Sequence, residues 1–192
     1  MDYKTATELL ENGQSCECIE FFKSGGYDIE YAYSLLLNDD LKLAESVIEP
    51  IDSIRADWLK KIIAIINGNI EYPTYFQIRN FLEIDLTIFI KSGRIDYVNA
   101  ILRLADVFQG INSETYKFLG RGLLKNDFPK ESKIFLDRSL ESYYNDVELH
   151  YLFVEYYMYI KDYDKAKKSA LTCLKINPEY YPAKKISEEL FN

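Results

Sequence analysis

The chain is poor in the residues that most often build catalytic, metal and disulfide sites. Its 192 residues include one His, three Cys and one Trp. A single histidine excludes a two-histidine zinc site and leaves only His150 as the base of a Ser–His or Cys–His dyad. Because the number of cysteines is odd, and because Cys16 and Cys18 would point to different faces of a helix, we expect no disulfide framework.

Motifs that bind nucleotides or present a nucleophile are missing as well. The patterns G-x4-G-K-[ST], G-x-G-x2-G and G-x-S-x-G do not occur. His150 falls at a helix packing position, and most carboxylates fall on helical positions that we expect to be exposed. We therefore predict that the chain is not an enzyme and that it uses no cofactor and no metal.

Basic residues are outnumbered, with 23 Lys and Arg against 31 Asp and Glu and a net charge of −8. Nucleic acid and anionic lipid both require a basic surface, so neither is expected as a general partner. The densest apolar run, residues 62–66, is far too short to cross a membrane. Residues 1–5 carry an acid almost at once, which is unlike a signal peptide. These observations predict a cytoplasmic protein.

Glycine and proline are also scarce, with eight and five residues, which argues against a loop-rich β architecture and favours helices. Apolar residues recur at helical spacing in short blocks. Helix-breaking pairs separate the blocks, among them Asn12-Gly13, Gly25-Gly26, Asn38-Asp39, Asn67-Gly68, Ser92-Gly93, Asn126-Asp127, Lys161-Asp162 and Asn177-Pro178. Asp146 is placed to cap a helix that follows it. The pattern predicts an all-α chain of about twelve helices.

The C-terminal half of the chain aligns with itself at an offset of 34 residues. Tyr116, Leu119 and Leu123 fall on His150, Phe153 and Tyr157, and a second set, Ser132 and Leu136, falls on Ala166 and Ala170. A period of 34 is typical of a repeat made of two antiparallel helices. Each such unit exposes an apolar face that only the next unit can cover.

These residues resemble the tetratricopeptide repeat family, whose first helix reads W-x2-L-G-x2-Y. The corresponding stretch here is Tyr116-x2-Leu119-Gly120-x2-Leu123, in which Gly120 stands where two helices approach closely. Small residues at 166, 170 and 173, followed by Pro178, match the second helix and its end. No unit has the Trp, and Val154 replaces the glycine in the last one. The resemblance implies a right-handed α-solenoid of helical hairpins.

The resemblance is clearest over residues 75–192 and suggests a division of the chain. Residues 1–72 are interpreted as degenerate hairpins of the same kind. Residues 73–192 are interpreted as three units, at about 75–110, 113–144 and 147–178, followed by a closing helix at 179–191, and all parts are expected to form one continuous solenoid domain. In the first unit Asp85 falls on an apolar position, and a one-residue slip that uses Phe81, Ile84 and Ile88 for packing would remove this conflict.

In the family the first helices of successive units line a concave groove, which suggests a set of groove residues. Lys117 and Arg121 resemble half of the clamp by which some members hold a C-terminal carboxylate, but the other half is absent, because Glu83 and Thr87 stand in its place. The expected groove residues are Thr87 and Lys91 from the first unit, Lys117, Arg121 and Lys125 from the second, and Tyr151, Glu155 and Tyr159 from the third. This groove would suit a peptide with an acidic or carboxylate group near Arg121 and apolar side chains near Tyr151.

A purely structural interpretation of the same residues stays open. Arg121 and Glu155 would then pair across neighbouring helices, and Lys125 would be a solvated turn residue. Trp58, Tyr157 and Tyr163 are expected in the core, whereas Tyr151 and Tyr159 are candidates for the groove.

The function that fits these observations is a non-catalytic scaffold that binds a protein or peptide in its groove. A small acidic chaperone that holds a client protein, as in secretion, is an alternative. An RNA-reading helical repeat and a hydrolase with a buried carboxylate pair are weaker alternatives, since the first needs a basic groove and the second a closed polar cavity. Two copies of the chain could also pair through an exposed apolar end.

Overall fold

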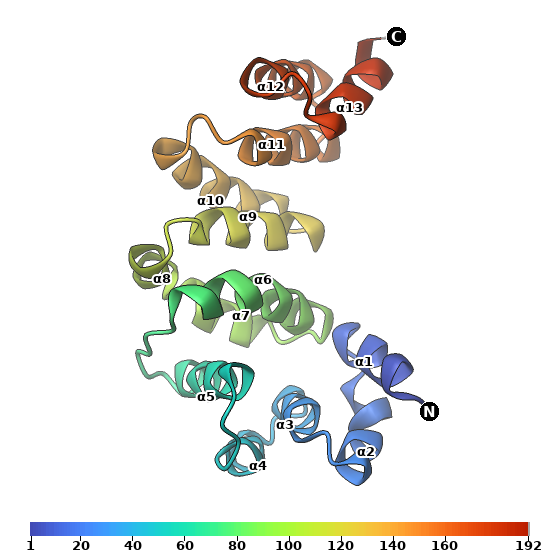
Figure 1. Cartoon of the computed structure of the whole chain (residues 1–192), viewed down its shortest axis with the longest axis vertical. Helices are drawn as coiled ribbons and strands as arrows, with labels where there is room; N and C mark the ends of the chain where they lie inside the picture. The colour runs from blue at the N-terminus through green and yellow to red at the C-terminus, as the bar shows by residue number, and fades with distance from the viewer. Residues whose placement is uncertain (192) are drawn as a thin grey trace. The chain divides into compact units, whose positions relative to one another are not determined.

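The computed structural model describes residues 1–191, with side chains as far as residue 189, and this part of the chain is entirely helical (Figure 1). The all-α prediction is therefore confirmed, with thirteen helices in the described residues against about twelve expected. The first eight are α1 (Tyr3–Glu11), α2 (Ser15–Gly25), α3 (Asp28–Leu37), α4 (Leu41–Ile48), α5 (Ile54–Ile66), α6 (Tyr75–Lys91), α7 (Ile95–Leu102) and α8 (Ala105–Ile111). The other five are α9 (Thr115–Lys125), α10 (Pro129–Ser142), α11 (Val147–Tyr159), α12 (Tyr163–Ile176) and α13 (Tyr181–Phe191).

The helices end where the sequence carries its breaking pairs. After α3, α11 and α9 the chain passes through a left-handed residue that is not glycine, at Asp39 (φ 70°), Lys161 (φ 61°) and Asp127 (φ 65°). Several helices begin with a side chain that caps their free N–H groups. Asp146 accepts hydrogen bonds from the N–H groups of Glu148 and Leu149, as the sequence predicts.

Contacts divide the chain into two compact units, Met1–Thr115 and Tyr116–Asn192. The first predicted repeat, residues 75–110, lies in the first unit, because α6 packs against α1, α5 and α7. The approach of α1 to α6 is close: a Cβ added to Gly13, which has φ 79°, would lie 2.5 Å from the carbonyl oxygen of Lys91. This contact brings the N-terminal helix onto the side of α6.

The core of the first unit surrounds the only tryptophan. Trp58 on α5 is fully buried, as expected from the sequence, together with Phe22, Phe89 and Phe108. The proposed one-residue slip on α6 is wrong, since Ile84 is 48% exposed and Asp85 is fully buried. Asp85 tolerates this position because donors from two other helices surround its carboxylate.

In the second unit, consecutive helices pack through small side chains. Ala166, Ala170 and Cys173 are fully buried on the face of α12 that packs against α11 and α13. Gly120 has the role predicted for it, because a Cβ at this position would lie 2.6 Å from Leu136 Cδ2 on α10. Ser132 Oγ on α10 also donates to the carbonyl oxygen of Gly120, at 2.7 Å.

Two tyrosines of this unit were expected in the core, with different outcomes. Tyr157 is half-buried and packs against the cluster that contains Leu136, Leu149 and Phe153. Tyr163 is 54% exposed, so its prediction is wrong. Its position explains the difference, because it is the first residue of α12, directly after the Asp162 cap, and is not among the residues packed around Ala166 or Leu136.

Candidate peptide-binding face on α9, α11 and α13

The basic residues of α9 meet acidic residues at the start of α11. Lys117 is only 4% exposed, and its Nζ lies 2.7 Å from Asp146 Oδ2 and 3.1 Å from Glu148 Oε2. Arg121, one turn further along α9, pairs through Nη1 with Glu148 Oε1. Glu148 thus lies between two cations, and Lys117 is a covered member of an ion-pair network.

The charge of Asp146 depends on this network. Burial disfavours the carboxylate, but the hydrogen bond from Lys117 and the N–H groups of Leu149 and Glu148 outweigh burial and lower the pKa of Asp146. The same side chain caps α11. One residue therefore couples the position of α9 to the start of α11.

The structural interpretation paired Glu155 with Arg121 across neighbouring helices. Burial raises the pKa of Glu155, and the positive charges of Lys125 and Arg121 oppose that rise. Glu148, two turns earlier on α11, also contacts Arg121 directly. Lys125, exposed at the end of α9, acts on Glu155 through its charge.

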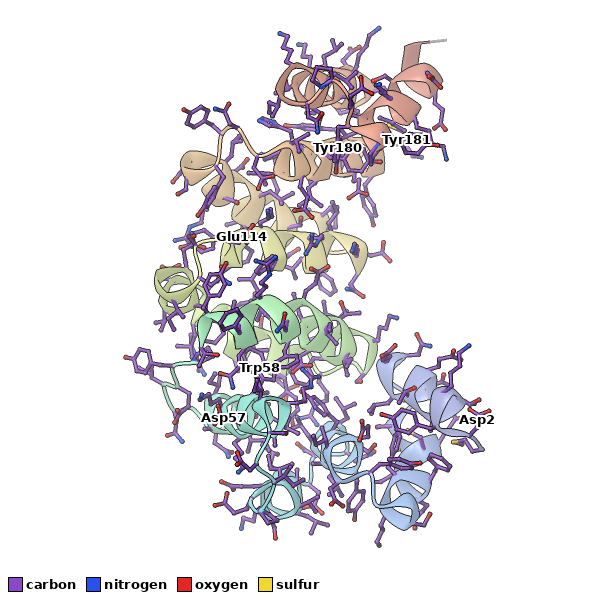
Figure 2. The ribbon with its side chains drawn as sticks, in the orientation of Figure 1. Asp2, Asp57, Trp58, Glu114, Tyr180 and Tyr181 are labelled. Atoms are coloured by element: carbon purple, nitrogen blue, oxygen red, sulfur yellow. The ribbon has the colours of Figure 1, made fainter. Side chains whose placement is uncertain are left out.

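A cavity with two tyrosines in its lining lies further along α11 from Glu148. Tyr151 of α11 is half-buried, and its ring meets that of Tyr180 edge to face, with centroids 5.7 Å apart. Figure 2 shows Tyr180 and Tyr181 where the chain enters α13. A cavity of about 280 Å³ lies between α11 and α13, lined by Tyr151, Tyr181, Pro182, Lys185, Ile186 and Glu189. Burial, reinforced by the negative charge of Glu155, raises the pKa of Tyr151, so its hydroxyl stays neutral and can donate at neutral pH.

The other predicted groove residues lie in several places. Tyr159, at the end of α11, is 47% exposed. Thr87 and Lys91 belong to α6 in the first unit, where Thr87 is half-buried and Lys91 Nζ donates to Asn12 Oδ1 at 2.9 Å. Of the predicted groove residues, Lys117 and Arg121 thus lie together beside Asp146 and Glu148, whereas Thr87 and Lys91 belong to the other compact unit.

Sequence reasoning missed Glu148 and the α13 side of the cavity. Glu148 shares a helical face with Tyr151 and Glu155 at i, i+3 and i+7, so the predicted stripe could have been extended by one turn. Tyr181, Lys185 and Glu189 also share a face at i, i+4 and i+8. The sequence shows that spacing, but it does not show that α13 lines a cavity, which depends on how α13 packs on α12.

Comparisons with protein-family models, with curated proteins and with solved structures found no match to this chain. No helix in the part of the chain that the structure describes combines the length and the apolar composition needed to span a membrane. The described residues also contain no group of three His, Cys, Asp or Glu arranged to hold a metal ion.

Proposed function

We propose that the chain is a non-catalytic protein-interaction module, built as a right-handed solenoid of tetratricopeptide-like hairpins, which binds a peptide segment of another protein. The peptide would lie on the face formed by α9, α11 and α13. The observation that carries the proposal is the cavity between α11 and α13, whose lining combines tyrosine and aliphatic side chains with Lys185 and Glu189. Such a mixture is typical of surfaces that anchor one large side chain of a partner.

The cavity suits an apolar or aromatic side chain as the main anchor. Burying a side chain of that size stabilises a complex by about 1.5–3 kcal/mol, so neighbouring contacts must supply the remainder. An acidic group of the peptide would have to compete with Glu148 for Arg121, and with Asp146 for Lys117. We therefore assign the acidic group a secondary role that adjusts specificity.

Two exposed tyrosines of the same unit permit a matched test. Tyr181 lines the cavity and is 72% exposed, whereas Tyr144 is 70% exposed and is not among the residues that line it. Neither ring fills the core, so Tyr181→Ala and Tyr144→Ala should leave the fold intact. Full-length chain and both variants would be used to capture partners from native lysate, with quantification by mass spectrometry.

We expect Tyr181→Ala to reduce the captured amount of at least one partner about tenfold or more, while Tyr144→Ala captures it as wild type does. The reason is that truncating a central interface residue weakens binding by about 1.4 kcal/mol or more. A partner profile that is the same for wild type and Tyr181→Ala would contradict the proposal. Circular dichroism of the three proteins confirms that any loss is not caused by unfolding.

A further inference from the structure

The first unit contains a cavity of its own, built by four helices. Its volume is about 230 Å³. The lining residues are Tyr3, Thr7, Leu10 and Glu11 of α1, Ile29, Glu30 and Tyr33 of α3, Arg55 of α5, and Ile84 and Ile88 of α6. All of them lie within Met1–Thr115, so this cavity is separate from the one between α11 and α13.

Four of the ten lining residues are aliphatic and form an apolar part of the cavity wall. Leu10 and Ile88 are 5% and 4% exposed and belong to the packed core, while Ile84 beside them is 48% exposed. An exposed isoleucine next to buried ones leaves apolar surface on which a partner's hydrocarbon chain can lie.

The single cation of the cavity is already neutralised. Arg55 Nη2 donates to Asp85 Oδ1 at 2.6 Å, and the guanidinium is held between the rings of Tyr33 and Phe81, at 4.6 and 4.5 Å from their centroids. Its Nη1 is enclosed and has no hydrogen-bond partner among the described residues. Because Asp85 balances its charge, the guanidinium offers little net positive charge to an anion in the cavity.

The remaining charges are negative. Glu30 Oε1 accepts a hydrogen bond from the hydroxyl of Tyr3 at 2.7 Å, and Glu11 lines the same cavity. The bond to Glu30, with burial, raises the pKa of Tyr3 to about 12, so this tyrosine is a neutral donor at neutral pH. Because the charges of Arg55 and Asp85 balance each other, the carboxylates of Glu11 and Glu30 give the cavity a net negative charge.

We propose that this cavity binds a Lys or Arg side chain of a protein partner. The aliphatic stem would lie on Leu10, Ile84 and Ile88, and the cationic head would pair with Glu30, supported by Glu11. The charge of the unit favours such a partner: residues 1–115 contain 10 basic and 19 acidic side chains, a net charge of −9. This site does not depend on the peptide-binding face of the second unit.

Trp58 supplies the readout because it is the only tryptophan in the chain. Its indole Nε1–H donates to Asp85 Oδ2 at 2.5 Å, and Asp85 also accepts from the cavity residues Arg55 and Tyr33. Full-length chain would be titrated with Nα-acetyl-arginine amide, and in parallel with the neutral, nearly isosteric Nα-acetyl-citrulline amide. The indole N–H resonance and the backbone amides of α1 and α3 would be followed by NMR.

We expect saturable shifts with the arginine amide, with a dissociation constant in the millimolar range, and binding of the citrulline amide that is about tenfold weaker. Glu30→Gln should weaken arginine binding about tenfold, while Glu20→Gln, an exposed residue of α2 outside the cavity, should leave it unchanged. If Glu30→Gln does not fold, Glu11→Gln serves as the cavity variant, with a smaller expected loss. Absence of saturable shifts, equal binding of the two amides, or unchanged binding by the folded cavity variant would overturn the proposal.

Discussion

Asp85 is a single buried residue that connects three polar side chains inside the first unit. Its carboxylate is fully buried and accepts hydrogen bonds from Arg55, Tyr33 and Trp58, which come from α3 and α5. Removing an ion pair from water is costly, and the attraction between the two charges offsets that cost only with good geometry and full hydrogen bonding. The network therefore stabilises the unit only while all partners are present.

Asp85→Asn should destabilise the first unit by about 3–5 kcal/mol, because it leaves the charge of Arg55 buried without a counter-charge. The double variant Arg55→Met with Asp85→Asn removes that charge and keeps an amide oxygen for Tyr33 and Trp58. It should therefore recover more than half of the loss. Urea unfolding followed by the fluorescence of Trp58 measures both. A single variant within about 1 kcal/mol of wild type would show that the network is not a buried ion pair of this kind.

At the scale of helices, close approach and turn geometry decide which small residues are required. Gly120 lies where α9 meets Leu136 of α10, whereas Gly110, on the short helix α8, has open space around its Cβ position. Both glycines are helical, so they share the same intrinsic preference for replacement by alanine. They differ only in what surrounds them.

Gly120→Ala should destabilise the second unit by about 1–3 kcal/mol, since the new methyl group would have to displace Leu136, a fully buried residue. Gly110→Ala should instead stabilise its helix by about 0.5–1 kcal/mol. Chemical unfolding followed by circular dichroism distinguishes the two. Opposite signs are required, and a stabilising Gly120→Ala would refute the close approach of α9 and α10.

The turn before α11 should make stability depend on pH. The pKa of Asp146 is lowered in the folded chain, so its stabilisation is complete above the ordinary aspartate value, about 3.9, and is lost as the pH falls through the lower folded value. Asp146→Asn keeps a capping oxygen but loses the charge that Lys117 binds.

At pH 7 this variant should lose about 1–3 kcal/mol, and the difference from wild type should shrink as the pH falls from 5 to below 3. Asp164→Asn, an exposed first-turn residue of α12, provides the control and should lose no more than about 0.5 kcal/mol. Urea unfolding at several pH values checks both. If the difference stays constant with pH, the charge of Asp146 does not contribute to the stability of the folded chain.

Much of the helix pattern could be predicted because helix ends depend on local residues. Asn38-Asp39, Asn126-Asp127 and Lys161-Asp162 each mark a helix end, and each includes a residue with positive φ. The close approach at Gly120 could also be predicted, because a small residue at this position of a repeat indicates that two helices lie close together. The repeat architecture itself stays a prediction.

The polar interior could not be predicted, because its partners are distant in sequence. Asp85 meets Tyr33 from 52 positions away, and Lys117 meets Asp146 from 29 positions away. The helical pattern placed the charged Asp85 at a position expected to be apolar, but it did not show that Arg55 and Trp58 would donate hydrogen bonds to it. Likewise, the charge of Lys117 suggested a groove, whereas its acidic partners cover it.

At the scale of the whole molecule, the net charge of −8 is distributed unequally. Residues 1–115 carry a net −9, while residues 116–192 have 13 basic and 12 acidic side chains, a net +1. Self-repulsion should therefore be concentrated in the first unit. The sequence-level argument against polyanionic partners applies mainly to that unit.

Raising the NaCl concentration from 10 to 150 mM should stabilise the first unit by roughly 1 kcal/mol, because the screening length falls from about 30 Å to about 8 Å. Fluorescence of Trp58 during urea unfolding reports this unit alone, because Trp58 is the only tryptophan. The variant Glu45→Gln with Asp52→Asn, at two exposed positions, should reduce the salt effect. A midpoint that falls with added salt would show that local ion pairs outweigh repulsion.

The unequal accessibility of the three thiols gives the natural sequence a site for selective chemical labelling. Cys16 on α2 is exposed, whereas Cys18 and Cys173 are buried, and burial raises the pKa of Cys173 to about 11. A maleimide reacts with an accessible thiolate, so a dye or a surface tether should attach at Cys16 alone. Cys16 lines neither cavity, and the unaltered chain can therefore be immobilised with Tyr181 and Glu30 left available to ligands in solution.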